Sequence, residues 1–143
     1  EGCSLTTINK ENYGTGFNAV GGGVYAMEWM SSAIEIFFFA RNAIPADIAS
    51  GDPDPTTWGT PVGSFSGPGC SIDSHFKNHK IVINNTFCGK WGGQVWSQSS
   101  CSELAPTCEA YVAANPKAFT QAYWLINSVK VYQLNVAAGK RET

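Results

Sequence analysis

The chain has 143 residues, of which 43% are hydrophobic and 14% charged, a composition typical of one globular domain with a core. Its formal net charge of −2 offers no basic surface for phosphates, so nucleic acid is not expected as a partner. The longest uncharged apolar stretch, Ile36–Ala40, is far below the roughly 20 residues that cross a bilayer, so we expect a soluble protein without a membrane partner. The sequence begins at Glu1 without a leader, which suggests that an upstream signal or longer segment is missing from it.

The first half of the chain predicts a loop, a hairpin and a second loop. Residues 1–23 are polar and rich in glycine, ending in Gly21-Gly22-Gly23, and are typical of an extended loop. Residues 24–30 and 33–39 have strand composition around a Ser31-Ser32 turn. This hairpin is apolar on both faces, so we expect it inside a covered sheet. Proline and glycine then favour one long ordered loop over residues 42–69.

The second half predicts two further strands and one helix. Residues 80–87 and 130–134 have strand composition, the latter preceded by the apolar residues 123–126. Residues 106–114 predict a helix that starts at Pro106 and ends before Asn115-Pro116, and residues 117–122 predict another turn. The sequence therefore predicts a single all-β domain over residues 1–143, an antiparallel β-sandwich with one short helix.

The cysteine pattern favours disulfides over a metal site, because the sequence has no C-x-x-C and no histidine at zinc-ligand spacing. Cys101 and Cys108 bracket a short loop and are expected to pair. Cys70 and Cys88 flank a predicted strand and form a possible second pair, although sequence does not fix the connectivity. Cys3 then has no partner within the chain. The glycosylation acceptor Asn84-Asn85-Thr86 indicates the same oxidising, secreted setting.

Familiar catalytic motifs are absent: the sequence has no phosphate loop, no G-x-S-x-G and no H-E-x-x-H. His75 and His79 lack a nearby third ligand, so no metal or cofactor is expected. Glycosidases use two carboxylates across one bond, and Glu28 with Glu35, seven residues apart around a turn, does not fit that pattern well. We interpret Glu28 as a strand carboxylate bonded to polar neighbours. The pair of Asp52 and Asp54 in a proline-rich loop fits no better, so no catalytic residue is predicted.

Aromatic side chains are the remaining chemical signal, with five Trp, five Tyr and eight Phe. Flat aromatic faces suit the C–H surfaces of pyranose rings. Trp58 and Trp91 stand in glycine-rich polar sequence and are the candidate sugar platforms, although a core position is an equally good interpretation of Trp91. The other aromatics are interpreted as core, notably Phe37, Phe38, Phe39, Phe87, Tyr123 and Trp124.

Several segments together resemble the fungal, basidiomycete-type laminarinases of glycoside hydrolase family 16, which are endo-1,3(4)-β-glucanases. The resemblance covers nearly all of residues 1–135 and is carried by residues 21–29 (GGGVYAMEW), 44–48 (IPADI), 58–61 (WGTP), 73–76 (DSHF), 84–91 (NNTFCGKW) and 122–124 (AYW). It implies the C-terminal half of a jelly-roll sandwich with a glucan cleft. The retaining chemistry of that family comes from an E-x-D-x-x-E strand in the other half, and no such string occurs here.

The resemblance also implies roles for three residues. Trp91 matches the tryptophan of a G-x-W-x-G segment near the family's cleft, and Asn84 matches a glycosylated asparagine. Cys3 matches a cysteine whose partner lies in the missing half, which would account for the odd cysteine count.

Two functions follow from this half-length resemblance. The main interpretation is a secreted, noncatalytic, lectin-like protein that binds β-glucan or another glycan on exposed aromatics. The alternative is the C-terminal piece of a split or processed glucanase that hydrolyses β-glucan only with its N-terminal half. A third interpretation is a structural or defence protein without a sugar site.

Half a sandwich would leave apolar residues such as Ile36, Phe38 and Ile83 uncovered, at about 25 cal/mol per Å² of wet apolar surface. We therefore expect a self-closed small sandwich, a homodimer, or a separate N-terminal half-domain bound to this chain, with Cys3 as a candidate link in the last two cases.

Overall fold

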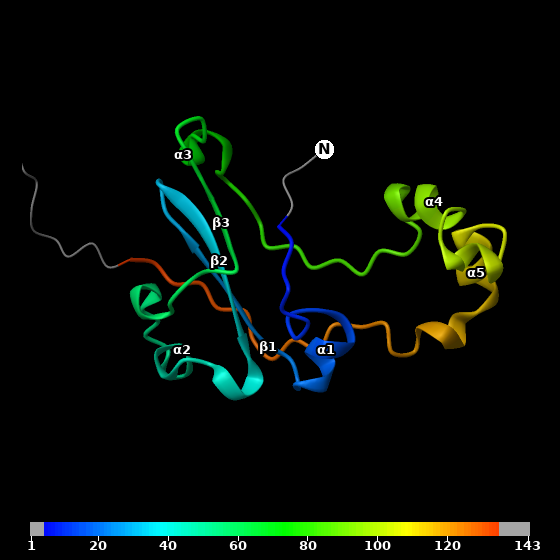
Figure 1. Cartoon of the computed structure of the whole chain (residues 1–143), viewed down its shortest axis with the longest axis horizontal. Coiled ribbons are helices and arrows are strands. Elements are labelled where there is room, and N and C mark those ends of the chain that lie inside the picture. The colour runs from blue at the N-terminus through cyan, green and yellow to red at the C-terminus, as the bar shows by residue number, and fades with distance from the viewer. Residues whose placement is uncertain (1–4, 135–143) are drawn as a thin grey trace, which may run out of the picture. The chain divides into compact units, whose positions relative to one another are not determined.

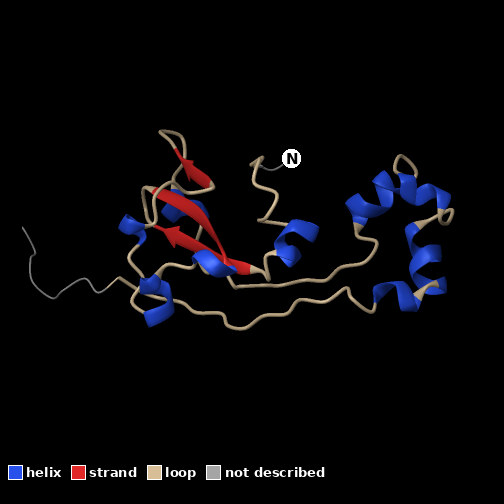
Figure 2. Cartoon of the chain, turned by 60° about the horizontal axis from the view of Figure 1, so that its bottom comes forward, coloured by secondary structure: helices blue, strands red, loops and turns tan. Residues whose placement is uncertain are grey.

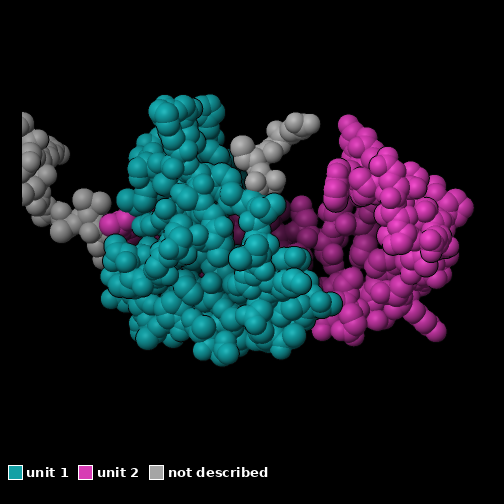
Figure 3. Space-filling model, viewed as in Figure 1, with its two compact units in different colours: residues 1–80 teal, residues 81–143 magenta. Residues whose placement is uncertain are grey.

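The computed structural model describes residues 5–134, and the chain divides into two compact units, residues 1–80 and residues 81–143 (Figure 3). The expected single β-sandwich domain over residues 1–143 stays a prediction. In chain order the elements are α1 Gly14–Ala19, β1 Gly23–Trp29, β2 Ala33–Ala40, η1 Arg41–Ala43, α2 Ala46–Ser50, η2 Pro55–Thr57, β3 Gly63–Ser66, α3 Ile72–His75, α4 Lys90–Trp96, η3 Ser100–Glu103, α5 Cys108–Ala114 and η4 Pro116–Phe119.

The first unit is built on a three-stranded antiparallel sheet in the order β1-β2-β3 (Figure 1). The predicted hairpin is confirmed: β1 pairs with β2 along its whole length, from Gly23 opposite Ala40 to Trp29 opposite Ile34. Met30 donates its backbone N–H to the carbonyl of Ala33 at 2.9 Å and so closes the turn. Runs of aromatic and β-branched residues around a tight turn favour this pairing locally.

The glycine run before β1 is a sharp turn that follows a helix. Gly21 and Gly22 have φ values of +75° and +85°, which glycine adopts without steric cost. A Cβ on Gly23 would lie 2.3 Å from the carbonyl oxygen of Phe39, so the two strands approach each other closely there. Residues 1–23, expected to be a loop, therefore include the short helix α1. The sequence does not predict this helix, because it has no acidic residue in its first turn and no side-chain cap.

The segment expected as one long loop, residues 42–69, contains the end of η1, the helix α2, the 3-10 turn η2 and the third strand. Pro45 precedes α2, and Gly51 ends it in the left-handed conformation with φ of +88°. The strand β3 joins the sheet as four residues, with Phe65 opposite Ile34. Such a short run between glycines carries too little periodicity to be recognised in the sequence, and its pairing with β2 decides its conformation.

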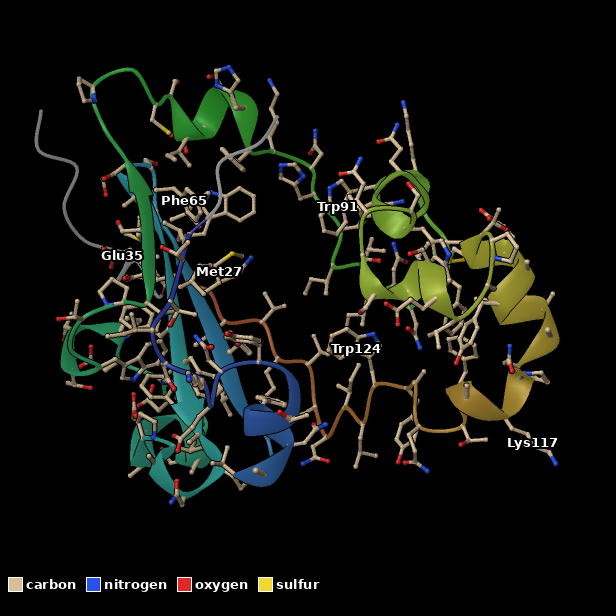
Figure 4. The ribbon with its side chains drawn as sticks, turned by 45° about the vertical axis from the view of Figure 1, so that its right-hand side comes forward. Met27, Glu35, Phe65, Trp91, Lys117 and Trp124 are labelled. Atoms are coloured by element: carbon tan, nitrogen blue, oxygen red, sulfur yellow. A yellow bond between two sulfur atoms is a disulfide. The ribbon has the colours of Figure 1, made fainter. Side chains whose placement is uncertain are left out.

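The two faces of the sheet have different environments. On one face Phe37 is buried, and the rings of Phe37 and Phe39 pack against Trp58 from the β2–β3 connection. On the other face Tyr25 and Met27 are more than half exposed. Met27 and Glu35 accordingly project from opposite sides of the sheet (Figure 4). The face that carries Tyr25 and Met27 is covered only in part: Ile34 is buried on it and Phe17 of α1 packs against Tyr25 and Phe38. The expectation of a sheet covered on both faces is therefore met in part.

The second unit consists of short helices. The predicted helix over residues 106–114 is confirmed as α5, where the side chain of Thr107 caps the first turn by accepting from the N–H of Ala110 at 3.2 Å. Asn115 and Pro116 end the helix as expected, and η4 lies in the predicted turn region. The helix α4 contains Gly92 and Gly93, so its intrinsic helix propensity is weak and the sequence does not predict it.

The disulfide of the second unit joins Cys88 to Cys108, with a Cα–Cα distance of 5.5 Å. The expected pairing of Cys101 with Cys108 is therefore wrong, and so is the pairing of Cys70 with Cys88. A disulfide needs converging Cα–Cβ bonds at about this separation, and proximity in sequence does not ensure that. Among the described residues Cys70 and Cys101 form no disulfide, while Cys3 lies outside them.

The two strands predicted in the second half do not form in this structure. Residues 81–87 and 123–134 belong to no strand or helix and are drawn as long loops (Figure 2). Phe87, Tyr123 and Trp124, expected in a core, are exposed, and Ile83 is 47% exposed. A strand needs a hydrogen-bonded neighbour, and none is described for either segment. The described residues thus contain a small antiparallel sheet with helices, and neither the complete sandwich nor a self-closed one.

Candidate functional site

Trp58, one of the two expected sugar platforms, is turned toward the sheet. Its ring meets Phe37 and Phe39 edge-on, with centroid distances of 5.2 and 5.6 Å, and its Nε1 donates to Oδ2 of Asp47 at 2.7 Å. One end of the indole is therefore packed and the other satisfied by a carboxylate. Trp58 is therefore half-buried where the β2–β3 connection folds it onto the strands, and its role as a sugar platform stays a prediction.

Asp47 holds that connection together. Its Oδ2 also accepts from the backbone N–H of Asp54 at 2.7 Å, so one carboxylate joins α2, the turn before η2 and Trp58. The hydrogen bond from Asp54, followed by the one from Trp58, keeps the pKa of Asp47 below its ordinary value despite some desolvation. Its sequence context, a carboxylate in the first turn of a helix, gives no sign of this role.

Trp91, the second expected platform, is 77% exposed in the first turn of α4. It projects from α4 on the side away from α5 (Figure 4). Among the described residues no hydrogen bond or ring contact fixes it. The open face of this indole is free to receive an apolar ring surface, which suits the sugar-platform interpretation better than the core one.

An open hollow of about 440 Å³ lies beside the disulfide, between α4 and α5. Lys90, Gly93, Gln94 and Ser97 line one side of it, at the spacing that places residues on a single helix face. Trp91, one position on from Lys90, lies on the next face and does not line the hollow. Glu109 and Thr107 are among the residues on the other side. The hollow thus offers ammonium, amide, hydroxyl and carboxylate groups to a polar ligand.

Glu28 and Glu35 are brought together by the hairpin, as direct cross-strand partners on one face of the sheet. Seven residues apart in sequence, they are adjacent because the turn lies midway between them. Glu35 accepts a hydrogen bond from the hydroxyl of Ser64 at 3.4 Å. The interpretation of Glu28 as a strand carboxylate bonded to polar neighbours stays a prediction. This face also carries Phe37 and Phe39.

An aromatic group that the sequence does not predict lies around Trp29 at the end of β1. The rings of Trp29, Phe76 and His79 are mutual neighbours, with centroid distances of 5.8–6.4 Å. Trp29 and Phe76 are 39% and 40% exposed. The group combines apolar ring surface with imidazole nitrogens, a combination suited to carbohydrate contact. The spacing of these residues in the sequence does not predict this contact, because it depends on how α3 places Phe76 beside β1.

Asn84 lies in an exposed segment outside any helix or strand, and its backbone carbonyl accepts a hydrogen bond from Nε1 of Trp124 at 3.0 Å. The acceptor triplet 84–86 is thus accessible, and its glycosylation stays a prediction.

Over residues 5–134 no group of three or more His, Cys, Asp or Glu is arranged to hold a metal ion. In the same range no helix has the length and apolarity to span a membrane.

Comparison with known proteins identifies the family. The model of the XgeA-like catalytic GH16 domain matches residues 1–132. The chain belongs to this GH16 family. An endo-1,3(4)-beta-glucanase of Arthroderma benhamiae is 46% identical over 142 residues, covering 98% of this chain and 31% of the relative. A probable endo-1,3(4)-beta-glucanase of Aspergillus fumigatus is also 46% identical, covering 96% of this chain and 22% of the relative.

Solved structures agree with this assignment. Laminarinase 16A from Phanerochaete chrysosporium, solved with 6-O-glucosyl-laminaritriose in its donor and acceptor sites, is 45% identical with a TM-score of 0.72. The match covers 82% of this chain and 40% of that one. An elongating GH family 16 beta-1,3-glucosyltransferase is 38% identical with a TM-score of 0.63, covering 79% and 39%. The GH16 chain therefore spans less than half of these solved relatives and less than a third of the two curated ones.

Proposed function

We propose that this GH16 chain acts as part of a secreted endo-1,3(4)-β-glucanase and corresponds to the C-terminal half of its catalytic domain. One observation carries the proposal: nearly the whole chain is 46% identical to named glucanases, yet it spans 31% or less of their length. Of the two functions that the sequence suggested, this agreement favours the glucanase piece over the independent lectin.

The cutting chemistry would then come from the remainder of the domain. A retaining glycosidase needs one carboxylic acid to protonate the leaving oxygen and a second carboxylate to form the glycosyl intermediate. The E-x-D-x-x-E string expected to supply both is absent from this sequence. The chain's own contribution would be glucan binding, with the exposed indole of Trp91 stacking on a glucose ring.

The proposal is tested by laminarin hydrolysis. The part of Phanerochaete chrysosporium laminarinase 16A that this chain does not span is produced separately and mixed with the full chain. We expect no release of reducing ends from either polypeptide alone and enzyme-like release from the mixture. Hydrolysis by the chain alone would contradict the proposal, as would a mixture that forms a stable complex and remains inactive.

A noncatalytic glycan-binding protein is the second candidate function, and the 77% exposure of Trp91 favours it. Equilibrium binding of laminarin to the chain alone distinguishes the two. Affinity for the chain alone equal to that of the active mixture would support the independent binder, whereas we expect the mixture to bind more tightly because a cleft needs both halves.

A further inference from the structure

The hollow between α4 and α5 lies within the second unit and has fixed walls. The disulfide from Cys88 to Cys108 links the chain just before α4 to the first residue of α5. At the end of α4, Trp96 donates its Nε1 to the carbonyl of Ala105 at 2.9 Å. A covalent link near the start of α4 and a hydrogen bond at its end thus hold the two helices beside each other (Figure 1). A site with walls fixed in advance loses little freedom when a ligand binds.

Part of the lining of this hollow is apolar and rigid. Trp96 and Pro106 line it beside the disulfide residue Cys88. The indole of Trp96 also contacts the ring of Tyr111, with a centroid distance of 5.9 Å, so its orientation is set by two partners within the unit. A fixed indole in a hollow offers apolar ring surface to the C–H groups of a pyranose.

The rest of the lining carries polar side chains that are free for a ligand. Lys90 and Gln94 belong to α4, and Glu109 belongs to the first turn of α5. All three are exposed, and among the described residues their side chains make no hydrogen bond or ion pair. The ammonium group donates, the carboxylate accepts and the amide does both, so a ligand with hydroxyl groups finds every kind of partner there.

Charge and volume limit the ligand that this hollow can take. Lys90 and Glu109 are the charged residues in its lining, and their opposite signs leave it without net charge. A polyanion would meet the carboxylate and a polycation the ammonium group, so a neutral polyhydroxylated ligand fits best. The volume of about 440 Å³ lies in the lower part of the range of about 300–1,000 Å³ for small-molecule sites. A mono- or disaccharide has the right chemistry and size.

Gly93 keeps this space open. It lies in the middle of α4, where glycine lowers helix stability relative to alanine. A Cβ at this position would lie 3.9 Å from Oε1 of Glu109, which is an ordinary van der Waals contact. A longer side chain on Gly93 would therefore enter the hollow beside Glu109. The glycine weakens the helix and leaves the carboxylate accessible from the α4 side.

We propose that the hollow between α4 and α5 is a second saccharide site, which takes a chain end or a short branch of a β-glucan. Trp96 contacts the sugar ring, while Lys90, Gln94 and Glu109 bind its hydroxyl groups. The identity of the sugar rests on the proposed function. The site is separate from Trp91, which projects from α4 on the side away from α5 and does not line the hollow (Figure 4).

The test titrates laminaribiose into the ¹⁵N-labelled full chain and follows each amide and indole N–H signal by NMR. We expect saturable shifts of the Trp96 indole and of the amides of Gly93 and Glu109, with a Kd of their own that differs from the Kd at the Trp91 indole. Glycerol at the same hydroxyl concentration should not produce them. Shifts confined to Trp91, or signals around the hollow that move without saturating, would overturn the proposal.

Two glycines of α4 supply a matched pair of variants. Gly93→Leu places a side chain in the hollow and should raise the Kd there by about tenfold or more. Gly92→Leu makes the same chemical change where a Cβ meets nothing within 4 Å and outside the lining, so it should leave that Kd unchanged. Both should keep the far-UV spectrum of the parent, because leucine favours a helix more than glycine does. Equal values for the two variants would contradict binding in the hollow.

Glu109→Gln keeps the shape of the hollow and tests its chemistry independently of the glycine variants. Replacing a charged acceptor by a neutral one should raise the Kd at the hollow by about fivefold, while the Kd at the Trp91 indole stays the same. An unchanged value at the hollow would remove Glu109 from the site and contradict the proposed hydroxyl contacts.

This inference and the proposed function fail separately, because the titration uses the chain alone and hydrolysis needs the mixture. Laminaribiose bound in the hollow of a chain whose mixture is inactive would support the saccharide site and contradict the glucanase. An active mixture with no binding in the hollow would do the reverse.

Discussion

At the residue scale, the two tryptophans that sequence treats alike have opposite environments. Both are followed by glycine, and the sequence makes both of them candidate sugar platforms. Trp58 packs on Phe37 and Phe39 and is anchored by Asp47, whereas Trp91 is open to solvent. Their substitution therefore separates stability from glycan binding.

For Trp91→Ala we expect a change in the free energy of unfolding within about 0.5 kcal/mol, as for an exposed side chain. Loss of a stacking surface worth about 1 kcal/mol should weaken laminarin binding roughly five- to tenfold. Urea denaturation and titration calorimetry measure the two quantities. Unchanged affinity would remove Trp91 from the site.

Trp58→Ala is the matched control and should behave in the opposite way. Removing a ring that fills the space over two phenylalanines should lower the free energy of unfolding by about 2–4 kcal/mol. At temperatures where this variant remains folded, its laminarin affinity should equal that of the parent chain. A variant that is fully stable but binds laminarin poorly would show that Trp58 contributes to glycan binding.

Asp47 predicts a pH dependence with a definite sign. Because hydrogen bonds from Asp54 and Trp58 hold its folded-state pKa below the ordinary 3.8, its contribution is complete above that value and is lost as pH falls through the lowered one. The Tm should therefore fall below about pH 4, and Asp47→Asn should flatten that part of the profile. An identical acid profile in the variant would assign the effect to other carboxylates.

At the element scale, regular elements form where the residues that stabilise them lie close together in the sequence. The β1–β2 hairpin pairs two adjacent runs through a short turn, and α5 carries its cap and its stop signals within a few residues. Residues 81–87 are as rich in strand formers but make no described backbone–backbone hydrogen bond, and they form no strand. A segment with the composition of a strand forms a strand only where a neighbouring strand pairs with it.

The disulfide is the main covalent constraint on the helices of the second unit. Joining Cys88 and Cys108 closes a loop with a sequence separation of 20 residues. Such a loop corresponds to about 3 kcal/mol in the chain-entropy model. The double substitution Cys88→Ser with Cys108→Ser should destabilise α4 and α5 by this order, measured by thermal unfolding in far-UV circular dichroism.

Cys101→Ser provides the control for that measurement and should leave the melting curve unchanged, because Cys101 forms no disulfide among the described residues. A melting temperature lowered equally by Cys101→Ser and by Cys108→Ser would instead support the pairing of Cys101 with Cys108.

At the scale of the whole molecule, burial is sparse. Within residues 5–134 the buried hydrophobic side chains are Ile34, Phe37 and Ile72. Many large apolar side chains in both units are exposed. The chain spans 40% of a solved GH16 relative, and under the proposed function the rest of the domain would cover this apolar surface.

The exposed apolar surface predicts dye binding. The chain alone should bind the fluorescent dye ANS strongly, as proteins with accessible apolar surface do. Adding the part of laminarinase 16A that this chain does not span should reduce that fluorescence, because association of the two polypeptides would cover the apolar surface. Equally strong fluorescence in a demonstrated complex would show that the surface lies elsewhere.

The sequence by itself determined the features that depend on neighbouring residues. These are the β1–β2 hairpin, the helix α5 with its end at Asn115-Pro116, and, through motif resemblance, membership of GH16, which the family match confirms. Local turns, caps and alternating apolar residues act within a few positions of the chain, so they can be read from it.

Only the tertiary structure decided which distant groups meet. It turned Trp58 inward, paired Cys88 with Cys108, added β3 to the sheet and assembled the rings of Trp29, Phe76 and His79. Each of these depends on the path of a connection between elements, and the same residue types would fit other paths. Whether an apolar segment becomes a strand depends in the same way on what lies beside it.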